Sequence, residues 1–502
     1  MPKRIRTVLL NPPPIGDVRF IREGRCMQSI DSWAAIWPPL TLAILASIAR
    51  KYGEVDLFDC NVEDDSGLES VLARVRRFAP DLVVVNNSFP SIEADSACAA
   101  AIRRACPNAP VVGYGVFFTL LEGQALETAT GYDLGIVGEP EVTFEELISR
   151  LAEGKPLYPM AGLAWRTEGR VESGPPRGLI ADLDHVPVAA RELLRNDRYV
   201  LPHNGRPFTL INVARGCPYP CTFCIAPVYY GKKLRKHSID YVLAELERCQ
   251  KELGLRDFLF WEEVFSLDRE YGVALCEALL RKGWDISWAT TTRADKVDEE
   301  LLRLMKRAGC MLLGLGIETA SQEILDGARK GVRVEQVRAA VAMCRRVGLK
   351  TMGHFIFGLP GETPRTVERT IDYAIELGLD YVQCYCAVPY PKTPLGEQAR
   401  EQGWIRSARW ADFDFGGFSI MDVGSIAPAG VDHARKEMFR RFYLRPSFLA
   451  RQVAMLLARP RQLLQASRFL RWMGQARWGS GSAPADARAR RGADPAPAEW
   501  KV

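Results

Sequence analysis

Short apolar runs alternate with amphipathic stretches over residues 1–185 of the chain. Residues 82–85 read Leu-Val-Val-Val, a continuous apolar run rich in a β-branched residue, which is typical of a strand buried on both faces. Residues 40–50, 68–78 and 92–105 repeat their apolar positions at the helical period. Strands separated by helices of this length predict an α/β unit of Rossmann type with a parallel, doubly wound sheet.

Residues 200–405 show a second alternating series. Several of its helical stretches end at a glycine, as at Gly309, Gly348 and Gly378, and glycine commonly follows the last turn of a helix. Six strand–helix units in series predict a partial (β/α)6 barrel, whose functional residues would lie at the carboxyl ends of the strands. The expected strands are 209–213, 257–261, 286–292, 311–317, 350–357 and 380–388.

Residues 406–478 form a third region with a different pattern. An aromatic stretch at 404–418 is a candidate lid over a substrate. The basic and apolar residues of 433–473 predict helices that either lie on a membrane surface or pack on the barrel. From 479 to 502 the chain is rich in Ala, Arg, Pro and Gly, and this composition predicts a disordered tail.

The overall composition narrows the class of protein. The chain has 502 residues, 47% of them hydrophobic and 25% charged, which suggests a globular protein of two or three domains. A net charge of +5 is small for this length and does not favour nucleic-acid binding. Thirteen cysteines outside a small secreted scaffold favour reduced thiols and a cytoplasmic location.

Three cysteines carry the clearest chemical signal. Cys217, Cys221 and Cys224 stand in a C-x3-C-x2-C array on a loop that contains Gly216, Pro218 and Pro220, directly after the strand expected at 209–213. Three thiolates on one short loop favour an iron–sulfur cluster in which one iron stays open to another ligand. A zinc site is the alternative, but it usually takes a fourth ligand and C-x2-C pairs. The array therefore predicts metal-ligating and catalytic cysteines.

This array, with Phe223 before its last cysteine, resembles that of the radical S-adenosylmethionine enzymes. The resemblance implies a 4Fe-4S cluster whose open iron chelates S-adenosylmethionine. It also implies that an electron from the cluster cleaves the cofactor to a 5'-deoxyadenosyl radical. An external electron donor of the flavodoxin or ferredoxin type would supply that electron.

Further motifs follow the predicted strands in the order known from that family. Glu262 and Glu263 resemble the acids that contact the ammonium group of S-adenosylmethionine, although a solvated acidic loop is the alternative. Arg293 is a candidate for a carboxylate of the cofactor or the substrate. The resemblance extends these cofactor-binding positions to Gly314, Gly316, Glu318, Gly358 and Gly361.

The first region resembles the cobalamin-binding domain that precedes many radical S-adenosylmethionine domains. Residues 116–118, Val-Phe-Phe, lack the histidine that many members have near this turn, so a histidine ligand to cobalt is not expected from here. A Rossmann-like domain that binds nothing is the alternative. The resemblance places the cobalamin contacts at Asn11, Asn86, Ser88, Gly113, Gly115, Gly138 and Glu139.

The combined resemblance implies a cobalamin-dependent radical S-adenosylmethionine methyltransferase. Such an enzyme would move a methyl group from methylcobalamin to an unactivated carbon of a small or hydrophobic biosynthetic substrate. One alternative is an anaerobic oxidative cyclase or a rearrangement enzyme acting on a tetrapyrrole-like substrate. Another is a non-catalytic regulator that binds cobalamin or a cluster. The location is expected to be cytoplasmic, with peripheral membrane contact through the C-terminal helices as an open option.

Overall fold

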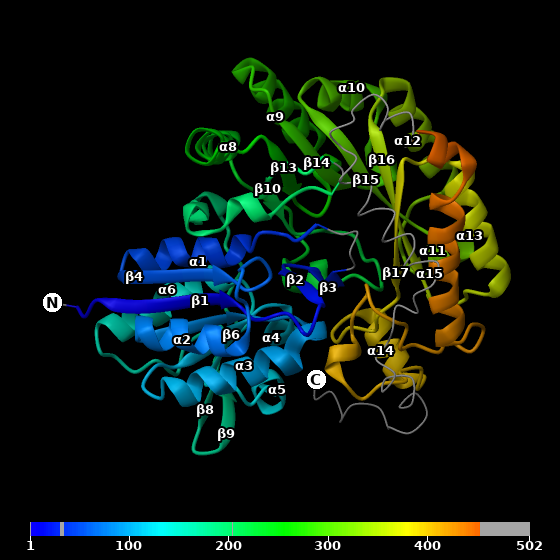
Figure 1. Ribbon diagram of the computed structural model, residues 1–502. Coiled ribbons are helices and arrows are strands. Elements are labelled where there is room, and N and C mark those ends of the chain that lie inside the picture. The colour runs from blue at the N-terminus through cyan, green and yellow to red at the C-terminus, as the bar shows by residue number, and fades with distance from the viewer. Residues whose placement is uncertain (1, 31–34, 203, 452–502) are drawn as a thin grey trace.

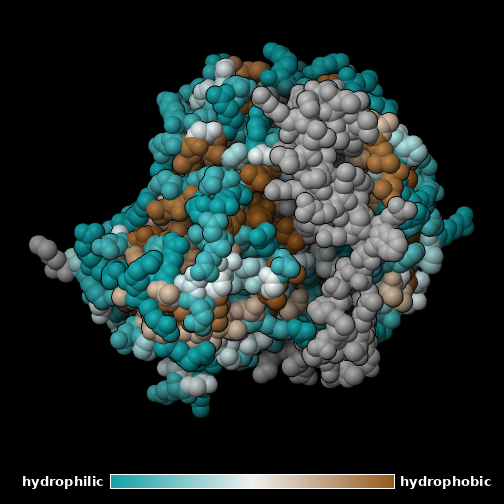
Figure 2. Space-filling view, in the orientation of Figure 1, coloured by the Kyte–Doolittle hydropathy of each residue, from teal (hydrophilic) through white to brown (hydrophobic). Residues whose placement is uncertain are grey.

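The computed structural model describes residues 2–30, 35–202 and 204–451, which form two α/β units and a C-terminal extension (Figure 1). Each unit is built on its own parallel sheet, and the two units lie side by side. Hydrophobic residues gather toward the middle of the face shown in Figure 2, while the outer rim is mostly hydrophilic. The fold therefore has the two-unit α/β organisation expected from the sequence.

The first unit contains a seven-stranded sheet in the order β4-β1-β5-β6-β7-β8-β9. Helices cover both faces, because Val83 packs toward α2 and α3 whereas its neighbour Val84 packs toward α1 and α6. The doubly wound Rossmann-type sheet is thus confirmed. Its strands are β1 (Ile5–Asn11), β4 (Gly53–Asp59), β5 (Leu82–Asn86), β6 (Val111–Tyr114), β7 (Leu134–Ile136), β8 (Leu163–Thr167) and β9 (Arg170–Ser173), the last two antiparallel. Its helices are α1 (Leu40–Arg50), α2 (Leu68–Phe78), α3 (Ile92–Ala105), α4 (Val116–Leu121), α5 (Gly123–Thr128) and α6 (Pro140–Ala152).

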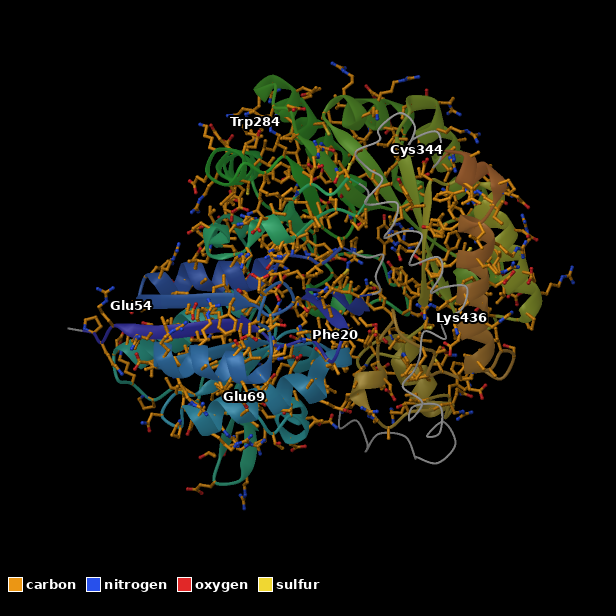
Figure 3. All side chains as sticks on the ribbon, viewed as in Figure 1. Phe20, Glu54, Glu69, Trp284, Cys344 and Lys436 are labelled. Atoms are coloured by element: carbon orange, nitrogen blue, oxygen red, sulfur yellow. The ribbon has the colours of Figure 1, made fainter. Side chains whose placement is uncertain are left out.

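A β-hairpin that the sequence pattern did not predict lies between the two units. It consists of β2 (Arg19–Glu23) and β3 (Cys26–Ile30), and Figure 1 shows it near the centre of the molecule. Figure 3 places its Phe20 there too, whereas Glu54 and Glu69 lie on the outer side of the first unit. The hairpin is therefore an interior element that joins the two units.

The second unit is a six-stranded parallel sheet in the order β10-β13-β14-β15-β16-β17. The order follows the chain and the sheet is open between its first and last strands, so the partial (β/α)6 barrel is confirmed. Its strands are β10 (Phe208–Asn212), β13 (Asp257–Trp261), β14 (Ser287–Thr292), β15 (Cys310–Glu318), β16 (Lys350–Phe357) and β17 (Tyr381–Cys386). Its helices are α8 (Ile239–Leu253), α9 (Arg269–Lys282), α10 (Glu299–Arg307), α11 (Gln322–Gly327), α12 (Val334–Val347) and α13 (Pro364–Glu376).

The C-terminal extension packs on the barrel over the part that the structure describes. After α14 (Pro394–Glu401), helix α15 (Pro428–Tyr443) lies along α13 and β17. Met438 and Phe442 are buried in the barrel core, and the Tyr443 hydroxyl donates to the Val382 carbonyl at 2.8 Å. Lys436 is on the exposed side of the same helix. Of the two interpretations of this segment, packing on the barrel holds up to residue 451, and membrane contact gains no support.

Two sequence predictions lie partly or wholly outside the described residues. The helical segment expected up to 473 continues beyond residue 451, and the tail expected to be disordered is 479–502. Within the ranges that the structure covers, no helix is both long and apolar enough to cross a bilayer.

The aromatic stretch at 404–418 is largely interior and is not a simple lid. Trp410 is buried and its ring lies 5.8 Å from that of Phe89, while Phe413 lies 6.0 Å from Phe89. Phe89 belongs to the first unit, so this stretch packs against the first unit as well as against the barrel. Phe415 faces the barrel instead, with its ring 5.0 Å from that of Tyr385.

Candidate active site

The cysteine loop leaves the barrel at the carboxyl end of β10 and is anchored to the first unit. It runs from β11 (Ala214–Arg215) to α7 (Ala226–Tyr229), and β11 pairs with β12 (Arg235–Lys236). Gly216 has φ +98°, and a Cβ there would lie 2.2 Å from the Lys233 carbonyl oxygen, so only glycine fits. The backbone of the loop therefore requires the glycine of the motif, just as the chemistry requires its cysteines.

Arg215 ties this loop to the first unit through buried ion pairs. Its guanidinium nitrogens lie 3.1 Å from a Glu139 carboxylate oxygen and 2.6 Å from one of Glu141. Arg235 pairs with the same Glu139 at 2.8 Å. Glu139, expected from the sequence to contact cobalamin, is thus engaged in holding the cysteine loop against α6.

The three thiols of the loop are free and buried or partly buried. All thirteen cysteines lack a disulfide partner, and burial raises the pKa of Cys217 and Cys221 and that of Cys224 to about 12. Ligation as thiolates therefore needs strong positive charge beside them, which bound irons would supply. Over the described ranges, no group of three His, Cys, Asp or Glu side chains is arranged around a single point as one metal ion requires. A cubane instead binds each thiolate through a different iron.

The two acids after β13 point to different places. Buried Glu263 forms an ion pair with the partly buried Arg25 of the hairpin, and its charge acts on the Cys217 and Cys224 thiols. Glu262 accepts a hydrogen bond from the Thr290 hydroxyl, and burial raises its pKa to about 8. Of these two acids, Glu263 is therefore the one beside the cysteine loop, and burial raises its pKa as well. The structure thus separates two residues that the sequence had treated as a pair.

Arg293 supports the cysteine loop from the barrel side. Its guanidinium carbon lies 3.6 Å from the ring centre of Tyr219, a residue of the loop. Its nitrogens donate to Asp295 at 2.9 Å and to the Lys330 carbonyl at 2.8 Å. These contacts occupy most of its donors, so holding Tyr219 is a structural role that the sequence did not indicate.

Glu318 and Lys330 form a second buried pair near the cysteines. The Lys330 ammonium donates to the Glu318 carboxylate, and the charges of both act on the Cys221 thiol. Glu318 is at the end of β15 with φ +64°, an uncommon conformation for a residue other than glycine. Lys330 was missed in the sequence, where a lysine between Gly327 and Gly331 looks like an ordinary loop residue.

The glycines after the barrel strands make room for neighbouring side chains. A Cβ at Gly314 would lie 2.8 Å from His354 Nε2, and one at Gly316 would lie 2.7 Å from Lys330 Nζ. Gly358 and Gly361 belong to the turn after β16, where the Gly358 amide donates to Glu362. Phe223 is partly buried and packs against the core shared with the first unit. Cofactor contacts by these residues stay predictions.

The polar residues at the carboxyl ends of the first sheet hold the hairpin. The Asn86 amide donates to the Asn11 side-chain oxygen at 2.9 Å and to the Arg22 carbonyl at 2.8 Å. The Ser88 and Ser91 hydroxyls are 2.8 Å apart, and Arg22 pairs with buried Asp95 at 2.8 Å. Asn11, Asn86 and Ser88 therefore lie together at this edge, as the sequence predicted, and the hairpin starts from it.

The same edge retains features that fit a large polar ligand. A Cβ at Gly138 would have no atom within 4 Å, and the buried Tyr114 hydroxyl has no hydrogen-bond partner in the described part of the chain. Gly113 and Gly115 are instead closed in, since a Cβ would lie 2.3 Å from Phe118 and 2.4 Å from the Asn87 carbonyl. Phe118 and its neighbours in α4 are buried, so no imidazole is offered from this turn.

Comparisons with known proteins agree with this arrangement. Residues 211–374 match the family model described as the radical SAM superfamily, and residues 30–148 match the B12 binding domain. An uncharacterized methyltransferase from Pyrococcus horikoshii is 31% identical over 416 residues, 83% of this chain and 90% of that protein. The anaerobic magnesium-protoporphyrin IX monomethyl ester cyclase of Cereibacter sphaeroides is 27% identical, covering 82% of this chain and 68% of the cyclase.

A solved structure has the same fold. The radical S-adenosylmethionine methyltransferase TsrM from Kitasatospora setae superposes with a TM-score of 0.68 at 21% identity, covering 88% of this chain and 89% of TsrM. A two-unit α/β fold with a three-cysteine loop between the units defines a class of cofactor-dependent enzymes. The chain belongs to the cobalamin-binding radical S-adenosylmethionine enzymes, whose cofactors are a 4Fe-4S cluster, S-adenosylmethionine and cobalamin.

Proposed function

We propose that this enzyme transfers a methyl group to an unactivated carbon of a small or hydrophobic substrate. When bound, the cluster and S-adenosylmethionine supply a 5'-deoxyadenosyl radical, and cobalamin supplies the methyl group. The observation that carries the proposal is the hairpin. Its Arg22 carbonyl accepts a hydrogen bond from Asn86 at the edge of the first sheet where cobalamin is expected (the corrinoid edge). Its Arg25 pairs with Glu263 beside the cysteine loop (the cluster edge). A substrate between the two edges would lie within reach of both cofactors.

The residues around the hairpin tip keep this region dry and ordered. A Cβ at Gly24 would lie 2.1 Å from the Tyr230 hydroxyl oxygen and 3.2 Å from the Trp261 ring. Tyr230 and Trp261 are both buried, and Trp261 also stacks edge-on against Trp37 at 5.1 Å. Exclusion of water protects a reactive radical from side reactions. The paired side chains of Arg25 and Glu263 would orient the charged amino-acid end of S-adenosylmethionine.

The electron is proposed to come from an external donor of the flavodoxin or ferredoxin type. The ten other cysteines form no second array of three along the sequence, so the chain offers no second cluster motif. We further propose a cytoplasmic location, since all thirteen cysteines are free thiols.

Isotope transfer tests the proposal. Anaerobically reconstituted enzyme is incubated with a strong reductant, S-adenosylmethionine carrying a trideuterated methyl group, and metabolite extract from the source cells. The expected result is formation of 5'-deoxyadenosine together with a product that carries the trideuterated methyl group. Consumption of S-adenosylmethionine without label in any product would contradict methyl transfer.

An oxidative cyclase is the second candidate, because three of the similar proteins carry that name at 27%, 26% and 25% identity. The same incubation in oxygen-18 water separates the two functions. Incorporation of oxygen-18 into a tetrapyrrole product, without methyl label, would favour the cyclase.

A further inference from the structure

The inner face of the barrel is a wall of uncharged side chains. Along β16 and β17 partly exposed residues alternate with buried ones, and successive side chains of a strand point to opposite faces. The buried set includes Phe355 and Cys384, which pack in the core with α12, α13 and α15. The partly exposed residues include Met352, His354, Gln383 and Tyr385, and these four therefore line the concave side, away from the helices that Figure 1 shows outside the sheet.

Two polar groups on this wall are uncommitted. The Gln383 amide has no hydrogen-bond partner in the portion of the protein that the structure covers. His354 Nδ1 lies 3.2 Å from the Tyr385 hydroxyl, and the two rings are nearly parallel at 7°. His354 Nε2 has no partner among the described residues, and it lies against Gly314. His354 and Gln383 are direct neighbours in the ladder between β16 and β17.

The charges at the cluster end of this wall are already neutralised. His354 lies against Gly314 and Lys330 against Gly316 on the neighbouring strand β15, so the wall reaches the buried Lys330–Glu318 pair. The charges of Arg25 and Lys330 both lower the pKa of His354. Each of these cations has its own carboxylate, Glu263 for Arg25 and Glu318 for Lys330. Burial lowers the pKa of His354 to about 4, so its ring is neutral. An ionised group placed against this wall would lose its hydration without gaining a counter-charge.

We propose that the inner wall binds an uncharged part of the substrate that carries a hydrogen-bond donor and acceptor, such as an amide, next to an apolar body. Gln383 offers a donor and an acceptor, His354 Nε2 offers one more group, and Met352 packs against the apolar body. Tyr385 is a positioning residue that sets the tautomer and orientation of the His354 ring. This proposal rests on the proposed function for the nature of the reaction, and it adds the class of substrate.

Probes that are matched in shape but are neutral, negatively charged or positively charged test the wall directly. The full-length enzyme, reconstituted with cluster, S-adenosylmethionine and cobalamin, is titrated with arylacetamides, the matching arylacetates and the matching arylethylamines. Phenyl, naphthyl and indolyl members of each series are used, and Kd is measured by saturation-transfer NMR. The neutral amide is expected to bind at least about tenfold more tightly than either charged analogue.

Variants connect the preference to the wall. Gln383→Leu and His354→Phe are each expected to weaken amide binding about tenfold, whereas Gln398→Leu on the exposed face of α14 leaves it unchanged. Gln383→Glu places a carboxylate on the wall and is expected to shift the preference to the arylethylamine. Because Gln383→Glu is a second variant at the same position, the role of Gln383 can still be tested if Gln383→Leu does not fold.

Three outcomes would overturn the proposal. These are equal or tighter binding of a charged probe to the unmodified enzyme, no binding by any probe, and weakened S-adenosylmethionine binding in Gln383→Leu. The last would show that the wall belongs to the cofactor. Methyl transfer is measured separately, by the isotope label. If no label is transferred but the neutral probe is still preferred, only the proposed function is refuted.

Discussion

At the scale of single residues, burial and pairing decide which side chains can act. Glu262 and Glu263 are adjacent, yet one is held by Thr290 and the other pairs with Arg25 beside the cysteines. The two side chains diverge just after the end of β13, where Glu262 meets Thr290 of β14 and Glu263 meets Arg25 of the hairpin. The cysteines themselves were identified from spacing alone, since their chemistry depends on a contiguous loop.

Replacement of the two acids by glutamine should give different results. Glu263→Gln is expected to weaken S-adenosylmethionine binding about tenfold, because a charged partner for the cofactor's ammonium group is lost. Glu262→Gln should change it less than about twofold, because the pKa of Glu262 is raised to about 8 and glutamine resembles its protonated form. Equilibrium dialysis with labelled cofactor on cluster-loaded protein measures both. Equal losses in the two variants would refute the assignment of Glu263.

Glu362 should make folding stability depend on pH. Its side chain is fully buried, one carboxylate oxygen has no partner, and burial raises its pKa from 4.5 to about 8. Between these values only the unfolded chain releases the proton, so this group lowers the free energy of unfolding as pH rises. We expect Glu362→Gln to remove a loss of about 3 to 4 kcal/mol between pH 5 and pH 8.

Urea unfolding of cluster-loaded protein at a series of pH values measures this effect. Glu368→Gln, at an exposed position of α13, serves as the control. A Glu362→Gln profile parallel to that of the unmodified protein would contradict the assignment.

At the scale of elements, regular strands and helices followed from local pattern, but the hairpin did not. Several helices, among them α1, α2 and α3, have the bounds that the hydrophobic period predicts. The hairpin carries buried charged residues such as Arg22 and Glu23, which mask any apolar alternation. Their burial is stabilised by Asp95 and by the Thr41 amide at the start of α1, partners far away in the chain. Only the tertiary structure brings these partners together.

The hairpin turn can be tested with a pair of glycines. Gly24 and Gly16 have similar φ values, +51° and +58°, but only Gly24 is closely surrounded. Alanine at either position meets the same backbone strain, and at Gly24 it also meets the Tyr230 hydroxyl and the Trp261 ring. We therefore expect Gly24→Ala to cost about 2 kcal/mol more than Gly16→Ala. Equal urea midpoints for the two variants would show that the turn is not packed as described.

At the scale of the whole molecule, two units hold different cofactors and meet at the hairpin and the cysteine loop. Ion pairs cross the boundary from Arg215 to Glu139 and Glu141, from Arg235 to Glu139 and from Arg25 to Glu263. Removing one partner of a buried pair is costly, because the other charge is left without compensation. The boundary is therefore a fixed part of the fold.

Because the cluster and cobalamin are expected at different places, loss of one should leave binding of the other intact. Combined replacement of Cys217, Cys221 and Cys224 by alanine should abolish the visible absorption of the cluster. Corrinoid binding should stay within about twofold, because its edge lies in the first unit and distant sites behave independently. Iron and cobalt content of the reconstituted protein measure both. Joint loss of the two cofactors, with unchanged urea stability, would show that they share one site.

The sequence by itself determined the two α/β units, the parallel strands of their sheets and the three-cysteine loop, because hydrophobic period and ligand spacing are local properties of the chain. The order of the strands in the first sheet and its antiparallel edge, β8 and β9, came from the structure. Tertiary structure decided which acid faces the cysteines, that Glu139 anchors Arg215, and that Arg293 holds Tyr219. It also decided that a hairpin from the first unit reaches the barrel. Charges are buried only where their partners meet, and those partners come from segments tens to hundreds of residues apart.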